Sequence, residues 1–435
     1  MTNHLTRRGF LRRSASAGAL GLVASRVAAA PFGEASGPAM NFQSSSAGRI
    51  PASDDSMVPP AYRGFLKKNL HDLPTPALLI DLDVFEKNIK TLADYMKDKK
   101  ATFRPHGKAH KSSAIGKIQL AYGAKGICAA KLGEADPLVH GGIKDVLITA
   151  PVVGTLKIKR LMDLLAISPD VKAVVDNEQN AIDLSTAALA AKRKLKVAID
   201  VNVGQNRTGV EPADAERLAQ VVARQKGLEL IGLQGYGGNN QHTNGFDARK
   251  TREMASNEKV LTARQGLEKS GFDVSMVSVG GTGTYNIDAE VPGITEIQPG
   301  SFIFMDSHYN KIGGKDQQPA YSDFGNSLIV LATVISRPAT GNRVVVDAGV
   351  KALSTDESVP EVLDVSGVTY GGSGDEYGSI RWQNAPPSRD LKVGDQVLIT
   401  PGHCDTTVNL YNVFFGVRKG LVEHVWTIEG RGRSD

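Results

Sequence analysis

The chain has 435 residues, of which 41% are hydrophobic and 22% are charged, and its net charge is +5. This length exceeds one small domain, and the composition is that of a folded globular protein. Part of the positive charge lies in residues 1–30 and the rest forms no basic stripe, which excludes a nucleic-acid partner. With only Cys128 and Cys404, the chain is no disulfide scaffold, and sequence separation leaves open whether these two pair.

Residues 1–30 have the pattern of a twin-arginine signal peptide. Residues 6–11 read TRRGFL, and a weakly apolar stretch of small residues follows. That stretch is too short to span a bilayer and contains Arg26, so we expect export to the periplasm and no membrane partner. Residues 31–60 are rich in Ser, Pro, Ala and Gly, which predicts a flexible linker.

Short apolar runs alternate with amphipathic stretches through residues 61–315. The predicted strands are residues 77–80, 102–105, 126–129, 146–149, 172–175, 197–201, 230–234 and 276–279. Continuous apolar runs are typical of buried parallel strands, and the gaps have helical patterns. This repetition predicts an α/β fold, a (β/α)8 barrel of the TIM type.

A different pattern follows in residues 316–435. Strands are predicted at 327–336, 343–347, 361–369 and 396–400, with Gly and Pro turns and no long helices between them. We therefore expect a smaller, mostly β C-terminal domain. The segment 63–72 is a candidate to pack with it.

The sequence RPHGKAHK occupies residues 104–111, just after the second predicted strand. The active sites of such barrels lie at the carboxyl ends of the strands. A lysine beside other cations has a lowered pKa, so more of it is a neutral amine able to form a Schiff base. The octapeptide singles out Lys108, but taken alone it fits a solvated basic loop equally well.

The sequence SVGGTGTY at residues 278–285 follows the last predicted barrel strand. Glycines allow close backbone approach, and their amides together with threonine hydroxyls can cradle a phosphate. Barrels commonly bind phosphate at this late position. A lone glycine-rich loop is weak evidence, and this one lacks the lysine of a P-loop.

In the second domain, residues 402–405 read GHCD. Residues two apart on an extended segment share a face, so His403 and Asp405 could reach one metal ion while Cys404 points away. An imidazole and a carboxylate suit Mn²⁺, Mg²⁺, Zn²⁺ or Ca²⁺. Without the other motifs, a turn whose His and Asp only form hydrogen bonds would be the better interpretation.

Two further loops bring polar side chains to the barrel mouth. Residues 203–210 follow the sixth predicted strand and contain Arg207, a fixed cation. Residues 235–242 follow the seventh and contain Tyr236 and His242. Polar residues on several mouth loops point to a functional site more strongly than any one loop.

Together these motifs resemble the D-threonine aldolase and D-serine dehydratase group of fold-type III, alanine-racemase-like pyridoxal-phosphate enzymes. The resemblance runs from LPTP at residues 73–76 to the His403 motif, with the motifs in the same order. It implies a lyase that acts on a small D-amino acid, with pyridoxal 5'-phosphate and a divalent metal as cofactors. We also expect a homodimer.

The resemblance assigns roles residue by residue. Lys108 would hold the cofactor covalently, Arg207 would face its pyridine nitrogen, and Tyr236 would lie near its ring. His242 matches the position of the aldolase base. The residues expected to bind the phosphate are Gly281, Thr282, Gly283 and Thr284.

The resemblance also makes His403 and Asp405 the metal ligands. Residues 298–301 with 304–306, and residues 347–354, match further stretches near the site. One departure is Tyr377, which stands where relatives often carry His. The substrate range of this chain could differ for that reason.

Residue 405 bears on the choice of reaction. The related dehydratases pair the histidine with a cysteine, whereas Asp405 favours a harder ion and the aldolase reaction, which gives glycine and an aldehyde. The alternative is a D-serine or D-3-hydroxyaspartate dehydratase. An amino-acid racemase needs no metal, and a non-catalytic pyridoxal-phosphate-binding protein would be a single barrel without the His403 motif.

Overall fold

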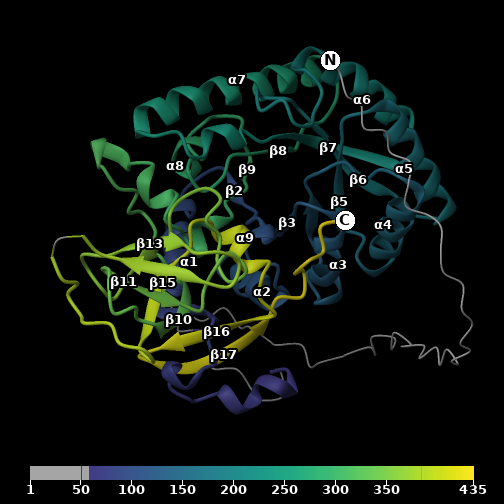
Figure 1. The fold of residues 1–435 in the computed structure, drawn as a ribbon. Helices are drawn as coiled ribbons and strands as arrows, with labels where there is room; N and C mark the ends of the chain where they lie inside the picture. The colour runs from purple at the N-terminus through teal and green to yellow at the C-terminus, as the bar shows by residue number, and fades with distance from the viewer. Residues whose placement is uncertain (1–49, 51–57, 384) are drawn as a thin grey trace, which may run out of the picture. The chain divides into compact units, whose positions relative to one another are not determined.

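The computed structural model describes residues 50, 58–383 and 385–435, all within one compact unit (Figure 1). The predicted signal peptide, residues 1–30, lies outside the described residues, as does most of the predicted linker. Packing begins inside the expected linker, because Val58 is buried and the Ile50 NH donates to Glu86 Oε1 at 2.8 Å. In the described part of the chain, no helix is both long and apolar enough to cross a membrane.

Eight parallel strands form the predicted TIM-type barrel, in the order β2-β9-β8-β7-β6-β5-β4-β3. They are β2 (Thr102–Phe103), β3 (Ile127–Ala129), β4 (Val146–Ile148), β5 (Lys172–Val175), β6 (Leu195–Asp200), β7 (Leu228–Gly235), β8 (Met276–Val279) and β9 (Glu296–Ile297). A parallel bridge between His106 and Cys128 connects the chain after β2 to β3 and closes the ring. The barrel fold is therefore confirmed.

Helices cross between the strands and cover the outside of the barrel, as α4, α5 and α6 do in Figure 1. The helices are α1 (Leu82–Met96), α2 (Ser113–Ala121), α3 (Leu132–His140), α4 (Thr155–Ile167), α5 (Glu178–Ala190), α6 (Ala215–Arg224), α7 (Phe246–Lys269) and α8 (Tyr285–Asp288). In α1, the Asp81 side chain caps the first turn. Its buried residues Phe85, Ile89 and Leu92 recur at helical spacing and face the core.

The prediction for the first barrel strand was wrong. Residues 77–80 form β1 (Ala77–Asp81), which pairs antiparallel with β10 and parallel with β16 in the second sheet. The eighth barrel strand is instead β9, whose two residues are too short for a periodic signal. The error arose because β1 is buried on both faces and so has the same apolar run as a barrel strand.

The second sheet has nine strands and confirms a mostly β C-terminal domain. Besides β1 they are β10 (Leu328–Ser336), β11 (Arg343–Val346), β12 (Glu361–Val362), β13 (Thr369–Gly372), β14 (Gly378–Arg381), β15 (Gln396–Thr400), β16 (Val413–Arg418) and β17 (Leu421–Thr427). The single strand expected at 361–369 is divided into β12 and β13, with Gly367 at φ 80° between them. The segment 63–72 packs here, since the Lys67 NH donates to Val422 O at 2.8 Å.

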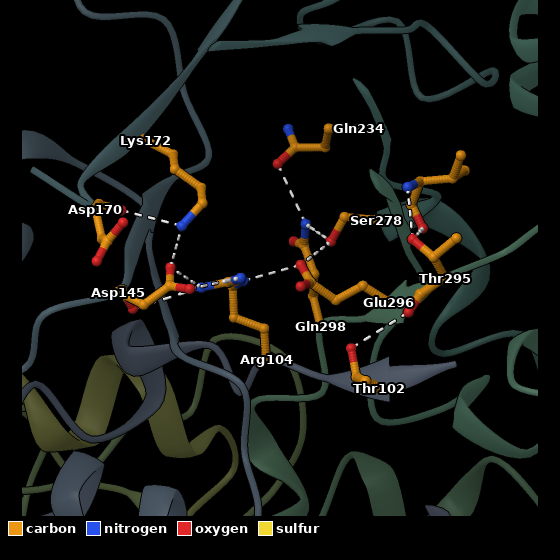
Figure 2. Close-up of polar contacts among 11 residues, drawn as sticks. Thr102, Arg104, Asp145, Asp170, Lys172, Gln234, Ser278, Thr295, Glu296 and Gln298 are labelled. Carbon is orange, nitrogen blue, oxygen red and sulfur yellow. Dashed lines mark hydrogen bonds and ion pairs between the residues drawn. The ribbon is translucent and has the colours of Figure 1, made fainter. Parts of the chain in front are cut away.

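A buried ion-pair network fills the amino-terminal end of the barrel (Figure 2). Arg104, which is fully buried, donates from Nε to Glu296 Oε1 at 2.9 Å and forms an ion pair with Asp145. Lys172 pairs with the same Asp145. Because Lys172 and Glu296 begin their strands and Asp145 directly precedes β4, these charges close the base of the barrel.

Polar side chains continue from this network up the barrel interior (Figure 2). Ser278 Oγ donates to Glu296 Oε1 at 2.7 Å, and Gln298 Nε2 donates to Ser278 Oγ at 2.9 Å. Gln298 Nε2 also lies 3.3 Å from Gln234 Oε1, and Gln234 Nε2 donates to Asp200 Oδ1 at 2.9 Å. A chain of hydrogen bonds thus runs from the base of the barrel to the carboxyl end of β6.

We expect Arg104→Met to destabilise the fold by about 3–5 kcal/mol, because it leaves Glu296 buried without its cation. Arg337→Met is the control, since Arg337 pairs with Asp390 on the surface and should cost no more than about 1 kcal/mol. Thermal and urea unfolding of both variants measure the difference. Equal losses in the two variants would show that the network does not stabilise the barrel base.

Candidate active site

Lys108 lies at the barrel mouth in a short 3-10 helix, η4 (Gly107–Ala109), after β2. The preceding His106 caps this turn: its side chain accepts from the Lys108 NH at 3.4 Å, and its Nε2 lies 3.2 Å from Thr149 Oγ1 after β4. A Cβ at Gly107 would lie 3.0 Å from Cys128 O, so glycine lets the turn pack against β3. Contacts with β3 and with the segment after β4 therefore fix the turn that carries the lysine.

An ion pair connects Lys108 to the C-terminal domain, with Nζ 3.4 Å from Asp405 Oδ2. Burial lowers the pKa of Lys108, but Asp405 and Tyr236 together outweigh burial, so the pKa is raised. Burial raises the pKa of Asp405, but Lys108 and His403 outweigh it and lower the pKa to about 2. The lowered lysine pKa expected from neighbouring cations was wrong, because the decisive neighbour is a carboxylate from the other domain.

Arg207 and Tyr236 lie together at the ends of β6 and β7. The Arg207 guanidinium lies over the Tyr236 ring, 5.5 Å from its centroid, and both line a small pocket with Asp200 and Thr208. Asp200 accepts hydrogen bonds from Thr208 Oγ1 at 2.7 Å and from Gln234 Nε2. Burial raises the pKa of Asp200 to about 6, although these hydrogen bonds oppose it. The chain of hydrogen bonds in the barrel interior thus ends at Asp200, in the same pocket as Arg207 and Tyr236.

In the glycine-rich loop after β8, the hydroxyls are already engaged. The Gly283 NH donates to Gln241 Oε1 at 3.0 Å, and Thr284 Oγ1 donates to Asp288 Oδ2 at 2.6 Å. Thr282 Oγ1 accepts from the Phe302 NH at 3.1 Å. The Thr282 backbone NH, by contrast, donates to no acceptor among the described residues. The Gly281 NH donates to Thr284 Oγ1 at 3.2 Å and the Thr284 NH to Gly281 O at 3.4 Å, so Thr282 provides the free amide of this loop, together with a hydroxyl that can still donate.

His242 belongs to a group of aromatic side chains at the mouth. Its ring stacks on His308, with centroids 3.9 Å apart and planes 5° apart, and packs against Tyr309 at 4.2 Å. Burial and, to a smaller extent, the neighbouring His308 lower the pKa of His242 to about 4. Its Nε2 has no hydrogen-bond partner within the described chain. At neutral pH this imidazole is therefore uncharged.

The His403 segment is not extended as expected, because Cys404 begins the short helix α9 (Cys404–Val408) with His403 at its N-cap. The acidic residue Asp405 in the first turn and the Thr407 hydroxyl, which donates to His403 O at 2.8 Å, favour this turn. Asp405 reaches Lys108, while His403 Nδ1 lies 3.4 Å from Asp306 Oδ2. Cys404 is buried and free, as is Cys128.

The donor chemistry of His403 and Asp405 fits a divalent ion, with an imidazole and a carboxylate on one side of the mouth. The Nδ1 of His403 has no hydrogen-bond partner of good geometry in the described chain. Across residues 58–383 and 385–435, no group of three or more His, Cys, Asp or Glu side chains is arranged to hold a metal. No metal site is therefore shown among these residues, and His403 with Asp405 as ligands stays a prediction.

Sequence reasoning missed several residues of the site. Asp306 is fully buried beside His403, and His308 lies on His242. Both could have been found, since the matched stretch ends at Asp306 and a histidine stands two residues further on. The stretch 347–354 reaches the His403 segment through Ser354, whose carbonyl accepts from the Gly402 NH at 2.9 Å. Tyr377 is half exposed and is not brought together with the other site residues by any contact we observe.

Comparison with known proteins agrees with this geometry. A family model described as alanine racemase, N-terminal domain, matches residues 80–308, and one described as a putative serine dehydratase domain matches residues 327–417. The chain is 37% identical to a 3-hydroxy-D-aspartate aldolase of Paracoccus denitrificans over 83% of this chain and 93% of that protein. It is 36% identical to a D-threonine aldolase of Arthrobacter sp over 87% of this chain and 97% of that protein. A solved D-threonine aldolase from Filomicrobium marinum, 38% identical, superposes with a TM-score of 0.80 over 85% of this chain and 99% of that chain.

The barrel, the β domain and the lysine at the mouth define an alanine-racemase-like enzyme. The chain belongs to this family, within the group that contains the D-threonine and 3-hydroxy-D-aspartate aldolases, and is a lyase. The predicted resemblance is confirmed. Membership implies pyridoxal phosphate as cofactor, and Lys108 with the free Thr282 NH of the glycine-rich loop fits that group.

Proposed function

We propose that the protein is a pyridoxal-phosphate-dependent lyase that cleaves D-β-hydroxy-α-amino acids of the D-threonine type to glycine and an aldehyde. The observation that carries this proposal is the neutral His242 imidazole with a free Nε2, at the same mouth as Lys108 and Asp405. The similarity to the two kinds of aldolase supports the reaction class. The homodimer stays a prediction from sequence.

The residues of the barrel mouth would hold the cofactor. The Lys108 amine would bind it covalently, Arg207 and Tyr236 would lie beside its ring, and the loop of residues 281–284, with its free Thr282 NH, would bind its phosphate. When bound, pyridoxal phosphate accepts the electron pair left at Cα of an amino acid. Lys108 starts from a protonated state, because Asp405 raises its pKa.

His242 would act as the general base. Its Nε2 accepts the proton of the substrate's β-hydroxyl. The Cα–Cβ bond would then break, Cβ and its oxygen would become the aldehyde, and the electron pair left at Cα would take up a proton, balancing the one that His242 accepted, to give glycine. The flat stack with His308 and the contact with Tyr309 orient the ring for this transfer.

His403 and Asp405 would bind a divalent metal, Mn²⁺, Mg²⁺, Zn²⁺ or Ca²⁺. Such an ion lowers the pKa of a hydroxyl bound to it. The low pKa of Asp405 keeps its carboxylate ionised, and His403 Nδ1 is paired with Asp306, which leaves Nε2 as the nitrogen for an ion. Asp306 keeps His403 turned toward the site, because it lies against the imidazole and accepts from the Cys404 NH at 2.9 Å.

We expect purified protein to convert D-threonine to glycine and acetaldehyde faster than it converts D-serine to pyruvate and ammonia. His242→Asn should lower kcat for cleavage by about 100-fold or more while cofactor absorbance is retained, because the base is lost. Lys108→Ala is the control without turnover. Identification of the products decides the matter: an oxo acid and ammonia from every substrate would make the enzyme a dehydratase.

Metal removal gives a second prediction. A chelator, or the variant His403→Ala, should lower turnover by roughly 100-fold or more, because the β-hydroxyl loses its Lewis acid. The visible absorbance of bound cofactor should persist, since Lys108 and the glycine-rich loop are separate groups. His140→Ala, in the exposed last turn of α3, serves as the control. Full activity in excess chelator would contradict the metal assignment.

We also propose that residues 1–30 direct export to the periplasm by the twin-arginine route after the cofactor has been loaded. The support is the sequence TRRGFL and the stretch that follows it. Replacing Arg7 and Arg8 by lysine should retain active, cofactor-bound enzyme in the cytoplasm, as cell fractionation would show. Replacing Arg12 and Arg13 by lysine is the matched control, and unchanged export of the first variant would refute the route.

A further inference from the structure

Arg249 connects three segments of the site from a fully buried position in the first turn of α7. Its Nε donates to Gly283 O of the glycine-rich loop at 2.7 Å. Its Nη1 donates at 2.9 Å both to Thr243 O, next to His242, and to Ile312 O. Its Nη2 donates at 2.9 Å to Gly313 O. One side chain thus holds the glycine-rich loop and the His242 segment against the turn after the His308 stack.

The charge of Arg249 has no close counter-charge in the protein. No carboxylate oxygen of the described residues lies within 4.0 Å of the guanidinium, which meets only backbone carbonyls and the rings of Phe246 and Tyr321. Burial lowers the pKa of Arg249, and Tyr321 and Asp323 raise it less than burial lowers it. Asp323 is itself engaged by the Tyr285 hydroxyl at 2.9 Å.

The place of Arg249 in its helix adds to this cost. Positive charge is disfavoured in the first turn of a helix, where the helix dipole is itself positive, and α7 is 24 residues long. A buried cation is stable only where it is paired or well solvated by hydrogen bonds. The carbonyl dipoles supply part of that compensation, and an anion bound nearby would supply the rest.

The loop held by Arg249 is the one proposed to bind the phosphate of the cofactor. The Gly283 carbonyl faces the guanidinium, and the Thr282 NH in the same loop has no acceptor among the described residues. In a buried setting of low dielectric constant, a cation on one side of the loop strongly attracts an anion bound on the other side. The arrangement therefore favours a phosphorylated ligand over an unphosphorylated one.

We propose that Arg249 is a positioning residue for the cofactor phosphate, fixing the glycine-rich loop and supplying the counter-charge of a phosphate bound there. This inference rests on the proposed function, because it takes pyridoxal phosphate as the ligand. It predicts that the role of Arg249 depends on the phosphate group. Affinity for pyridoxal, which lacks that group, should depend on Arg249 much less.

The test compares the binding of pyridoxal phosphate and pyridoxal to cofactor-free wild-type protein and three variants, by absorbance titration. Arg249→Gln should weaken the binding of pyridoxal phosphate at least about 10-fold more than the binding of pyridoxal, because it removes the charge. Arg249→Lys keeps the charge but loses the several N–H donors of the guanidinium. It should therefore weaken the binding of both ligands similarly and retain the preference for the phosphate. Arg252→Gln, exposed on the same helix, should bind as wild type does.

Two results would overturn the proposal. Equal weakening of both ligands in Arg249→Gln would leave Arg249 with a purely structural role. Loss of the phosphate preference in Arg249→Lys would show that the charge is not responsible, and this variant decides the matter if Arg249→Gln fails to fold. Failure of the wild type to bind pyridoxal phosphate through Lys108 would instead refute the proposed function, and a borohydride-reduced adduct at Lys108 distinguishes that case.

Discussion

The ion pair between Lys108 and Asp405 determines how the two parts of the protein form one site. Lys108 comes from a turn after β2 of the barrel, and Asp405 comes from α9 of the C-terminal domain. Without the carboxylate, burial and the nearby Arg207 would both lower the pKa of the lysine. In a barrel without the second domain, the Lys108 amine would therefore have a different pKa. The C-terminal domain thus contributes to the chemistry of the site.

Beneath that ion pair, the barrel interior is polar along one path rather than filled only by apolar side chains. The path begins at Arg104 and Glu296 and ends at Asp200, which accepts from Thr208 beside Arg207. Each residue on the path has at least one hydrogen-bond partner, although Glu296 Oε2 has none within the described chain, and these bonds restrict the rotamers of the residues below the mouth. The path thus joins the charges at the base of the barrel, through Thr208, to the loop that carries Arg207.

The sequence predicted the barrel, the β domain and the resemblance, because apolar runs and turn residues are local signals. It could not assign β1, since a strand buried on both faces has the same apolar run in either sheet. The extended form of the His403 segment was also wrong, because one helical turn is too short to show a period. Contacts between distant segments, such as His308 on His242 or Asp405 with Lys108, have no local pattern, and the pKa of Lys108 followed from them.

Arg104 and Arg249 are both fully buried guanidinium groups, and they differ in the charge that surrounds them. Arg104 lies at the base of the barrel and has two carboxylates, Glu296 and Asp145. Arg249 lies behind a loop of the mouth and has only carbonyls within hydrogen-bond distance. At the base no ligand arrives, so the chain itself must supply the negative charge. At the mouth an anionic ligand can supply it, and a protein carboxylate there would repel that ligand. The distribution of buried charge therefore follows from which end of the barrel is open.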